Sequence, residues 1–169
     1  MTSNQEPPTL GEFGGHEIYP MPVFATLAVA DVAATTAWYE RALGFSTVFR
    51  APEVDGQPAL VHLRRRKYQD LLLTPAPPGK WAAAPSSLTL SFNADGDVDS
   101  IAERARAIEP SGQSSITGPF NTPWNTRDVR VTDPAGHVLV FTGRNPDVDS
   151  ASLARMQALL DAGRVIEKN

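Results

Sequence analysis

The chain has 169 residues, of which 41% are hydrophobic and 20% charged, a composition typical of a globular protein with one domain or two small half-domains. It contains no cysteine, which excludes disulfides, thiolate metal sites and a cysteine nucleophile. The net charge of −4 argues against a nucleic-acid partner, because affinity for phosphate comes mainly from clustered Lys and Arg.

The first segment, residues 1–19, is rich in Pro, Gly and polar side chains and predicts a mobile arm. It lacks the basic start and apolar stretch of a secretory signal, and no window of the chain approaches the roughly 20 apolar residues that cross a membrane. These features predict a cytoplasmic protein with no membrane partner.

Residues 20–76 are predicted to form a β-α-β-β-β module. A strand over 22–29 precedes Asp31, which predicts the N-cap of a helix that ends at Gly44. The expected buried residues of this helix keep helical spacing: Val32, Thr35, Tyr39 and Leu43. The turn signal Asp55-Gly56 separates the strands that follow.

The basic cluster 64–67 (Arg-Arg-Arg-Lys) is the one local exception to the acidic balance of the chain. On a strand its members would alternate between faces, which favours a solvated edge or ion pairs over a nucleic-acid site.

Residues 77–85 are rich in Pro and Ala and predict a linker, in which Trp81 is a candidate to close either the ligand site or a groove between the subunits of a dimer. Residues 86–145 then repeat the first pattern about 63 residues further on. The second helix has Val98, Ile101, Ala105 and Ile108 on one face. It precedes a short strand broken at Pro119, a longer strand, the turn 133–136 (Asp-Pro-Ala-Gly) and a last strand.

Residues 146–169 predict a C-terminal helical extension. Asp149 or Ser150 would cap its start, and Gly163 would end it. Its apolar stripe consists of Leu153, Met156 and Leu160.

The segments LAVADVAATTAWYERALGF and PWNTRDVRVTDPAGHVLVFTGR together resemble the vicinal oxygen chelate superfamily, which includes glyoxalase I, extradiol dioxygenases and bleomycin-resistance proteins. The resemblance covers residues 20–145 and implies an α+β fold. Two βαβββ modules would form an open, cup-like mixed sheet with helices on the convex side, and the ligand would lie in the cup. Strand alternation agrees: Leu27 and Leu139 would face the helices, whereas Thr26 and Val140 would face the cup.

The resemblance also identifies four positions at which metal-dependent relatives carry His, Gln or Glu. Here these positions hold Phe24, Leu72, Val140 and either Ser87 or Thr89. None of these side chains is a competent ligand for a divalent ion. The three histidines have no ligating spacing either, so the sequence predicts no metal and no cofactor.

With apolar groups in these positions, the cup is expected to bind a small apolar or aromatic ligand. The candidate ligand-binding residues are Phe24, Thr26, His62, Asp70, Phe120, Trp124, Arg127 and Val140. Two prolines in PFNTPW place Phe120 and Trp124 on a loop or bulge near the rim, where an indole would stack on a planar ligand.

Several of these residues have alternative interpretations. Trp124 would merely pack the rim, and Arg127 would pair with Asp128 or another carboxylate rather than with a ligand anion. His62 beside Asp70 would supply a general base in an enzyme. Trp38 and Tyr39 are assigned to the core or an interface.

The leading hypothesis is a non-catalytic, homodimeric protein of the bleomycin-resistance type that sequesters an antibiotic or aromatic metabolite. The first alternative is an enzyme of the same superfamily, such as an isomerase, lyase or dioxygenase-like protein, with an atypical or absent metal site. The second is an interaction module with a filled cup, whose C-terminal helix recruits a partner protein.

Overall fold

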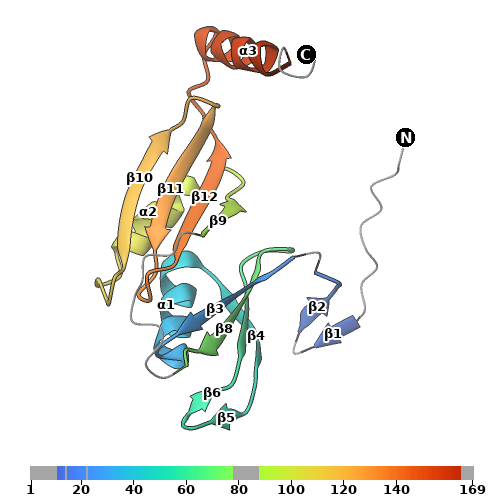
Figure 1. Ribbon diagram of the computed structural model, residues 1–169, viewed down its shortest axis with the longest axis vertical. Coiled ribbons are helices and arrows are strands. Elements are labelled where there is room, and N and C mark those ends of the chain that lie inside the picture. Colours follow the sequence, from blue (N-terminus) through green and yellow to red (C-terminus); the bar gives the residue numbers. More distant parts are fainter. Residues whose placement is uncertain (1–10, 14, 22, 78–87, 165–169) are drawn as a thin grey trace. The chain divides into compact units, whose positions relative to one another are not determined.

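The computed structural model describes residues 11–13, 15–21, 23–77 and 88–164, and the chain divides into two compact units, 1–84 and 85–169 (Figure 1). Trp81 and Ser87, both considered from the sequence, lie outside the described residues. Within those residues, no helix is long and apolar enough to cross a membrane.

The first unit contains a four-stranded mixed sheet with the order β3-β8-β7-β4. Its strands are β3 (Ala25–Val29), β4 (Ser46–Arg50), β7 (Val61–Arg64) and β8 (Asp70–Pro75). Strands β3 and β8 run parallel, whereas β7 is antiparallel to both of its neighbours. The buried side chains of the sheet alternate along the strands and include Leu27, Val29, Leu63, Leu71 and Leu73.

Helix α1 (Val32–Leu43) forms as the local sequence predicts. The Oδ1 of Asp31 accepts a hydrogen bond from Ala34 N at 2.8 Å, and Gly44 ends the helix in the left-handed conformation with φ of 71°. The four residues of the expected stripe are all buried, as is Trp38. The helix therefore contributes its apolar face to the core of the first unit.

Two short hairpins accompany this sheet. β5 (Glu53–Val54) and β6 (Gln57–Pro58) flank the expected turn at Asp55-Gly56. β1 (Gly11–Phe13) and β2 (His16–Ile18) pair within the segment expected as an arm, and the next residue, Tyr19, is buried.

The second unit repeats the topology, with strand order β10-β11-β12-β9. Its strands are β9 (Thr89–Asn93), β10 (Ser115–Asn121), β11 (Thr126–Thr132) and β12 (Val138–Arg144), and β9 and β12 are the parallel pair. Helix α2 (Val98–Arg106) buries Val98, Ile101 and Ala105, whereas Ile108 lies beyond the helix end and is only half-buried. The repeat of one module predicted from the sequence is confirmed.

Strand β10 differs from the expectation of a strand broken at Pro119. It continues through Pro119 to Asn121, with a shift of its register against β11 between Thr117 and Phe120. Proline has no backbone N–H to donate. It is tolerated there because β10 is an edge strand and its regular pairing with β11 is interrupted at this point.

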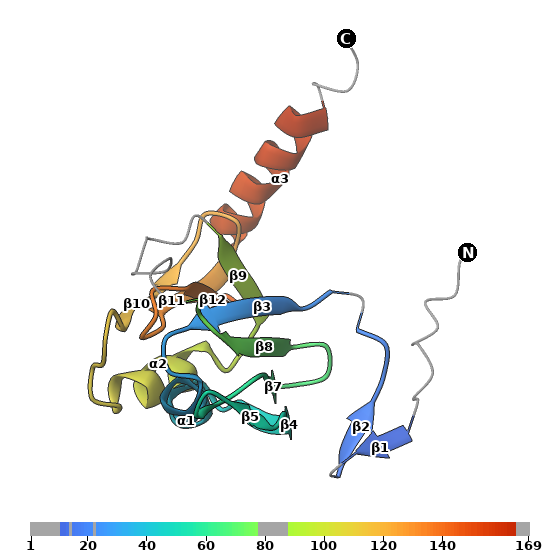
Figure 2. The same cartoon turned by 60° about the horizontal axis from the view of Figure 1, so that its bottom comes forward.

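Helix α3 (Ser150–Arg164) follows β12 and extends away from strands β10–β12 (Figure 2). Asp149 Oδ1 accepts a hydrogen bond from Ser152 N at 2.7 Å, which confirms the expected cap. On the expected stripe, Leu153 and Leu160 are exposed and Met156 is half-buried.

Candidate functional site

The face of the first sheet opposite α1 carries several of the residues singled out in the sequence. Thr26 of β3 pairs with Leu72 of β8, which pairs with His62 of β7, so these three side chains form one row across the sheet. Asp70 and Arg64 form the next row. Phe24 lies two residues before Thr26 and is 51% exposed. The sheet thus brings together the four candidates of the first module, namely Phe24, Thr26, His62 and Asp70.

The carboxylate of Asp70 is the centre of a polar cluster on this face. His62 Nε2 lies 2.8 Å from Asp70 Oδ2. Arg64 holds the same carboxylate with two nitrogens, Nε at 2.9 Å from Oδ1 and a terminal nitrogen at 2.8 Å from Oδ2. The Asp70 side chain is 1% exposed, whereas that of His62 is 23% exposed and so partly open to solvent.

Burial and hydrogen bonding have opposite effects on the pKa of Asp70. Burial raises the pKa of its carboxyl group, but hydrogen bonds from His62 and Arg64 outweigh burial and hold that pKa below its ordinary value. The Asp70 hydrogen bond in turn raises the pKa of the Arg64 guanidinium. The cluster therefore keeps a negative carboxylate next to a positive guanidinium and leaves His62 as its most accessible member.

Tyr19, which was not among the candidate residues predicted from the sequence, also belongs to this cluster. Its hydroxyl accepts a hydrogen bond from Tyr68 N at 2.8 Å and lies 3.5 Å from Asp70 Oδ1. The Arg64 guanidinium lies 4.3 Å from the centre of the Tyr19 ring, in cation–π contact, and Arg64 also donates to the carbonyl of Glu17 at 2.7 Å. These contacts join the segment before β3 to the polar cluster on the open face of the first sheet.

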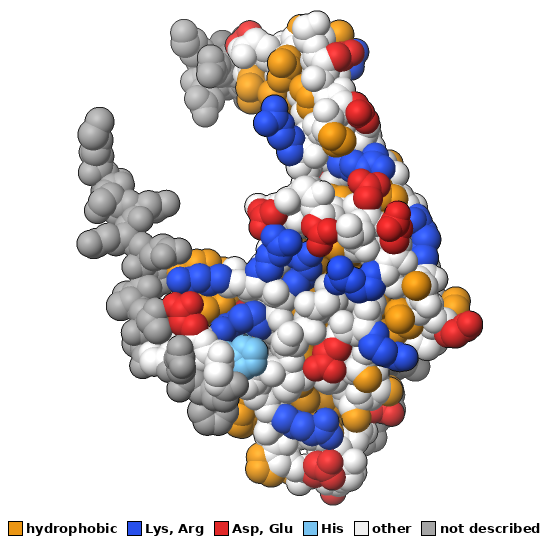
Figure 3. Space-filling view, turned by 180° about the vertical axis from the view of Figure 1, so that it is seen from behind, with side chains coloured by type: hydrophobic (Ala, Val, Ile, Leu, Met, Phe, Trp, Pro, Cys, Tyr) orange, Lys and Arg blue, Asp and Glu red, His pale blue; other side chains and the backbone are white. Residues whose placement is uncertain are grey.

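Two members of the basic cluster 64–67 form ion pairs, which confirms the ion-pair interpretation for these two residues. Arg64 pairs with Asp70, and Lys67 lies 3.3 Å from Glu17. Only Arg64 belongs to a strand, because β7 ends there. Figure 3 shows acidic and basic side chains interspersed on the face it presents, which is unlike the single basic stripe of a nucleic-acid-binding surface.

The corresponding row of the second sheet consists of Ser91, Val140 and Arg130. In the next row, Thr142 Oγ1 donates to Asp128 Oδ1 at 2.6 Å, and Phe120 of β10 is paired with Asp128. Phe120 is 45% exposed, and Val140 is half-buried. The face opposite α2 therefore combines hydroxyl and charged groups with a few apolar side chains and is less apolar than expected.

Trp124 and Arg127 lie away from this row. Trp124 occupies the turn between β10 and β11 and is 61% exposed, so it does not pack a core within the second unit. Arg127 forms a two-point ion pair with Asp99 of α2, at 2.8 and 2.6 Å, and donates to Asn121 Oδ1 at 3.0 Å. Its guanidinium thus ties β11 to α2, and the partner is Asp99 rather than Asp128.

The turn 133–136 has a structural role. The Asp133 side chain accepts hydrogen bonds from Ala135 N at 2.9 Å and His137 N at 2.8 Å, and its other oxygen lies 2.9 Å from His137 Nδ1. Asp133 is fully buried, and these contacts engage His137.

The residues at the four expected metal positions do not fit a divalent ion. The register makes Thr89, two residues before Ser91, the counterpart of Phe24, two residues before Thr26. Phe24, Leu72 and Val140 supply no lone pair, and a threonine hydroxyl alone is a weak ligand. Among the described residues, no group of three or more His, Asp or Glu side chains is arranged to hold a metal ion.

Comparison with known proteins gives a consistent result. The family model described as "Glyoxalase/Bleomycin resistance protein/Dioxygenase superfamily" matches residues 22–141. No curated protein sequence matches significantly.

Several solved structures share the fold. The antibiotic-binding protein TnmS3 from Streptomyces sp. CB03234 is 25% identical, with 72% of this chain and 93% of that chain covered and a TM-score of 0.55. The bleomycin resistance determinant encoded on transposon Tn5 is 24% identical, with 72% and 96% covered and a TM-score of 0.56. FosX from Listeria monocytogenes, a fosfomycin resistance protein complexed with Mn(II), is 13% identical, with 74% and 90% covered and a TM-score of 0.55.

Proposed function

Because the chain belongs to the glyoxalase/bleomycin resistance protein/dioxygenase superfamily, we propose that it binds and sequesters a small antibiotic or aromatic metabolite without transforming it. The observation that carries this proposal is the set of side chains at the metal positions. Phe24, Leu72 and Val140 offer apolar surface where a catalytic relative would need ligands for a metal. The likeness to an antibiotic-binding protein at 25% identity supports the same conclusion.

The proposed binding residues are the candidates on the open faces, Phe24, Thr26, His62, Asp70, Phe120 and Val140, together with Trp124 and Arg127. The aromatic rings of Phe24, Phe120 and Trp124 are exposed and suit a planar ligand. A flat molecule that covers such a ring removes apolar surface from water, which makes binding more favourable. In this proposal Arg127 acts mainly by holding β11, since its guanidinium is engaged by Asp99. The chain is proposed to act as a homodimer in the cytoplasm. Sedimentation of the purified chain tests whether it forms the homodimer.

Calorimetric titration with bleomycin and with the aromatic dye anilinonaphthalene sulfonate tests the proposal. We expect saturable binding of at least one of these probes, with the probe recovered unchanged by mass spectrometry. The variants Phe24→Ala and Trp124→Ala should weaken it about tenfold each, as loss of an aromatic contact does. Val54→Ala is the matched control, because Val54 is 59% exposed on a separate hairpin. Equal affinity in all three variants would refute the assignment of the site.

One observation favours an enzyme as the second candidate. His62 is oriented by a buried carboxylate, which is the arrangement of a histidine that acts as a general base. An isomerase or lyase would use His62 to remove a proton from its substrate. The enzyme alternative is tested by measuring the rate at which a bound compound is converted to product. His62→Ala is expected to abolish this turnover, and Thr26→Ala is expected to alter mainly KM. Recovery of every bound compound unchanged would exclude this alternative.

A further inference from the structure

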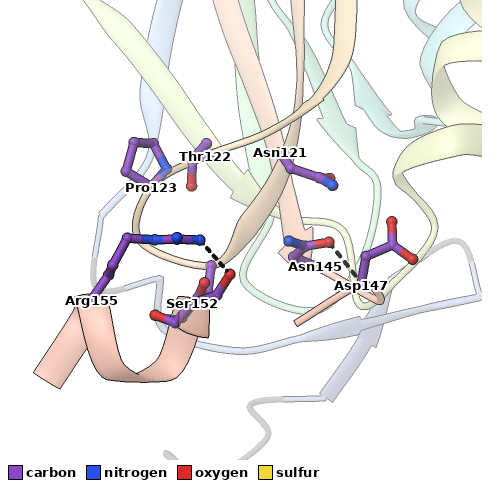
Figure 4. A pocket seen from close by; sticks show the side chains of 8 residues that line it. Asn121, Thr122, Pro123, Asn145, Asp147, Ser152 and Arg155 are labelled. Carbon is purple, nitrogen blue, oxygen red and sulfur yellow. Dashed lines mark hydrogen bonds between the residues drawn. The ribbon is translucent and has the colours of Figure 1, made fainter. Parts of the chain in front are cut away.

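The second unit contains a polar pocket, separate from the open face of its sheet, where the β10–β11 turn, the end of β12 and the start of α3 meet (Figure 4). Its volume is 430 Å³, within the range of small-molecule sites. The lining residues are Asn121, Thr122, Pro123, Asn125, Asn145, Asp147, Ser152 and Arg155. Apart from Pro123 they are polar, which is unusual because most pockets for small molecules are predominantly apolar.

Asn145 presents a hydrogen-bond donor to the pocket. It is 7% exposed, and its Oδ1 accepts a hydrogen bond from Asp147 N at 3.0 Å, which fixes the orientation of the amide. The amide nitrogen then points toward the side of the pocket where Ser152 lies (Figure 4). Among the residues that the structure describes, none accepts a hydrogen bond from it. This nitrogen is open to solvent rather than fully buried, so it is available to donate a hydrogen bond to a molecule bound in the pocket.

The charged groups around this amide limit the chemistry of that molecule. Asp147 brings a carboxylate and Arg155 a guanidinium, which also donates to Ser152 Oγ at 2.9 Å. Because these two opposite charges offset each other, the pocket favours neither an anion nor a cation. A neutral hydroxyl group suits all three residues, because each hydroxyl donates one hydrogen bond and accepts others.

We propose that this pocket binds a neutral, hydroxyl-rich group such as a sugar ring, with Asn145 and Arg155 donating to its oxygens and Asp147 accepting from its hydroxyls. The site is distinct from the proposed binding on the open faces, and Trp124, which is proposed to bind there, lies in the same turn as the pocket residues Pro123 and Asn125. The pocket uses α3, which lies outside the segment matched by the family model. A ligand with both an aromatic part and a sugar part would therefore find complementary surfaces of two kinds on this chain.

Amide-detected NMR of the full chain tests the proposal, with methyl glucoside, methyl mannoside, methyl galactoside and inositol as probes. We expect at least one of them to shift the signals of Asn125, Asp147 and the Asn145 side chain in a saturable way, with a Kd of about 1 mM or below. Sulfate and glycine betaine are the comparison probes, an anion and a zwitterion. Shifts produced by either of these instead of by the polyols, or by no probe at all, would overturn the proposal.

Two pairs of variants locate the site. Asp147→Asn and Arg155→Gln should each weaken polyol binding about tenfold, the usual loss for a hydrogen bond to a charged group. The matched controls are Asp161→Asn, on α3 but outside the pocket, and Arg104→Gln, an exposed arginine of α2. Both controls should bind as the unmodified chain does, and retained affinity in the two pocket variants would also refute the site. Circular dichroism of each variant verifies that it is folded.

Discussion

Arg64 and Asp70 form a two-point ion pair in which the carboxylate is almost completely shielded from water, since their side chains are 12% and 1% exposed. Asp70→Asn would leave the Arg64 guanidinium buried without its counter-charge. We expect this variant to lose about 3 kcal/mol of unfolding free energy, as other broken buried pairs do. Urea denaturation followed by circular dichroism measures the loss.

Asp99→Asn is the matched control for that variant. It also removes a two-point pair with an arginine, Arg127, but the Asp99 side chain is 56% exposed. Because water and salt screen such a pair, the loss should stay below about 1 kcal/mol. Equal losses in the two variants would show that burial does not set the strength of the Arg64–Asp70 pair.

The Asp70 cluster also predicts how stability depends on pH. The pKa of Asp70 is lower in the folded chain than in the unfolded chain, so its contribution is complete above the unfolded pKa of about 3.9 and is lost as the pH falls through the folded value. Between about pH 5 and pH 2, the original chain should lose more unfolding free energy than Asp70→Asn does. Parallel pH profiles for the two proteins would contradict this assignment.

Substitutions of Tyr19 and Tyr68 test whether the hydroxyl group of Tyr19 anchors the segment before β3 to the first sheet. Tyr19→Phe removes the acceptor of the Tyr68 amide hydrogen bond and should cost about 1 kcal/mol. Tyr68→Phe removes a hydroxyl oxygen that is buried and has no hydrogen-bond partner among the described residues, so it should be neutral or stabilising. Thermal unfolding of both variants distinguishes them, and a stable Tyr19→Phe protein would show that the segment is not anchored through this hydroxyl.

The contrasting exposure of two tryptophans predicts opposite responses to truncation. Trp38 is 4% exposed in α1, and Trp38→Ala should cost at least about 3 kcal/mol. Trp124→Ala should change the unfolding free energy by less than about 0.5 kcal/mol, since an exposed turn residue buries little surface. A large loss in Trp124→Ala would instead favour the interpretation that Trp124 packs the rim.

The local elements could be predicted because their signals lie within a few residues. Asp31 and Gly44 mark the two ends of α1, and the alternation in β3 and β12 separates buried from open-face side chains. The predicted break of β10 at Pro119 was wrong, because whether a proline interrupts a strand depends on whether that strand lies at an edge of the sheet.

The composition of the site was harder to predict, because its contacts join residues far apart in the chain. Tyr19 lies 51 residues from Asp70, and Arg127 lies 28 residues from Asp99. No local pattern encodes such pairs. The polar pocket likewise depends on where α3 starts after β12, and the amphipathic stripe of that helix does not specify it.

Helix α3 has consequences for how the chain meets proteases. Among the described side chains, Asn125 of the β10–β11 turn hydrogen-bonds to α3, reaching the Ser152 carbonyl and Met156 Sδ at 3.5 Å each. A 15-residue helix whose stripe residues Leu153 and Leu160 are exposed gains little from packing and should unfold locally well before the sheet does. Limited trypsin treatment should therefore cut α3, at Arg155 or Arg164, before it cuts the strands of the second sheet, and a ligand bound in the pocket that Arg155 lines should slow the cut at Arg155.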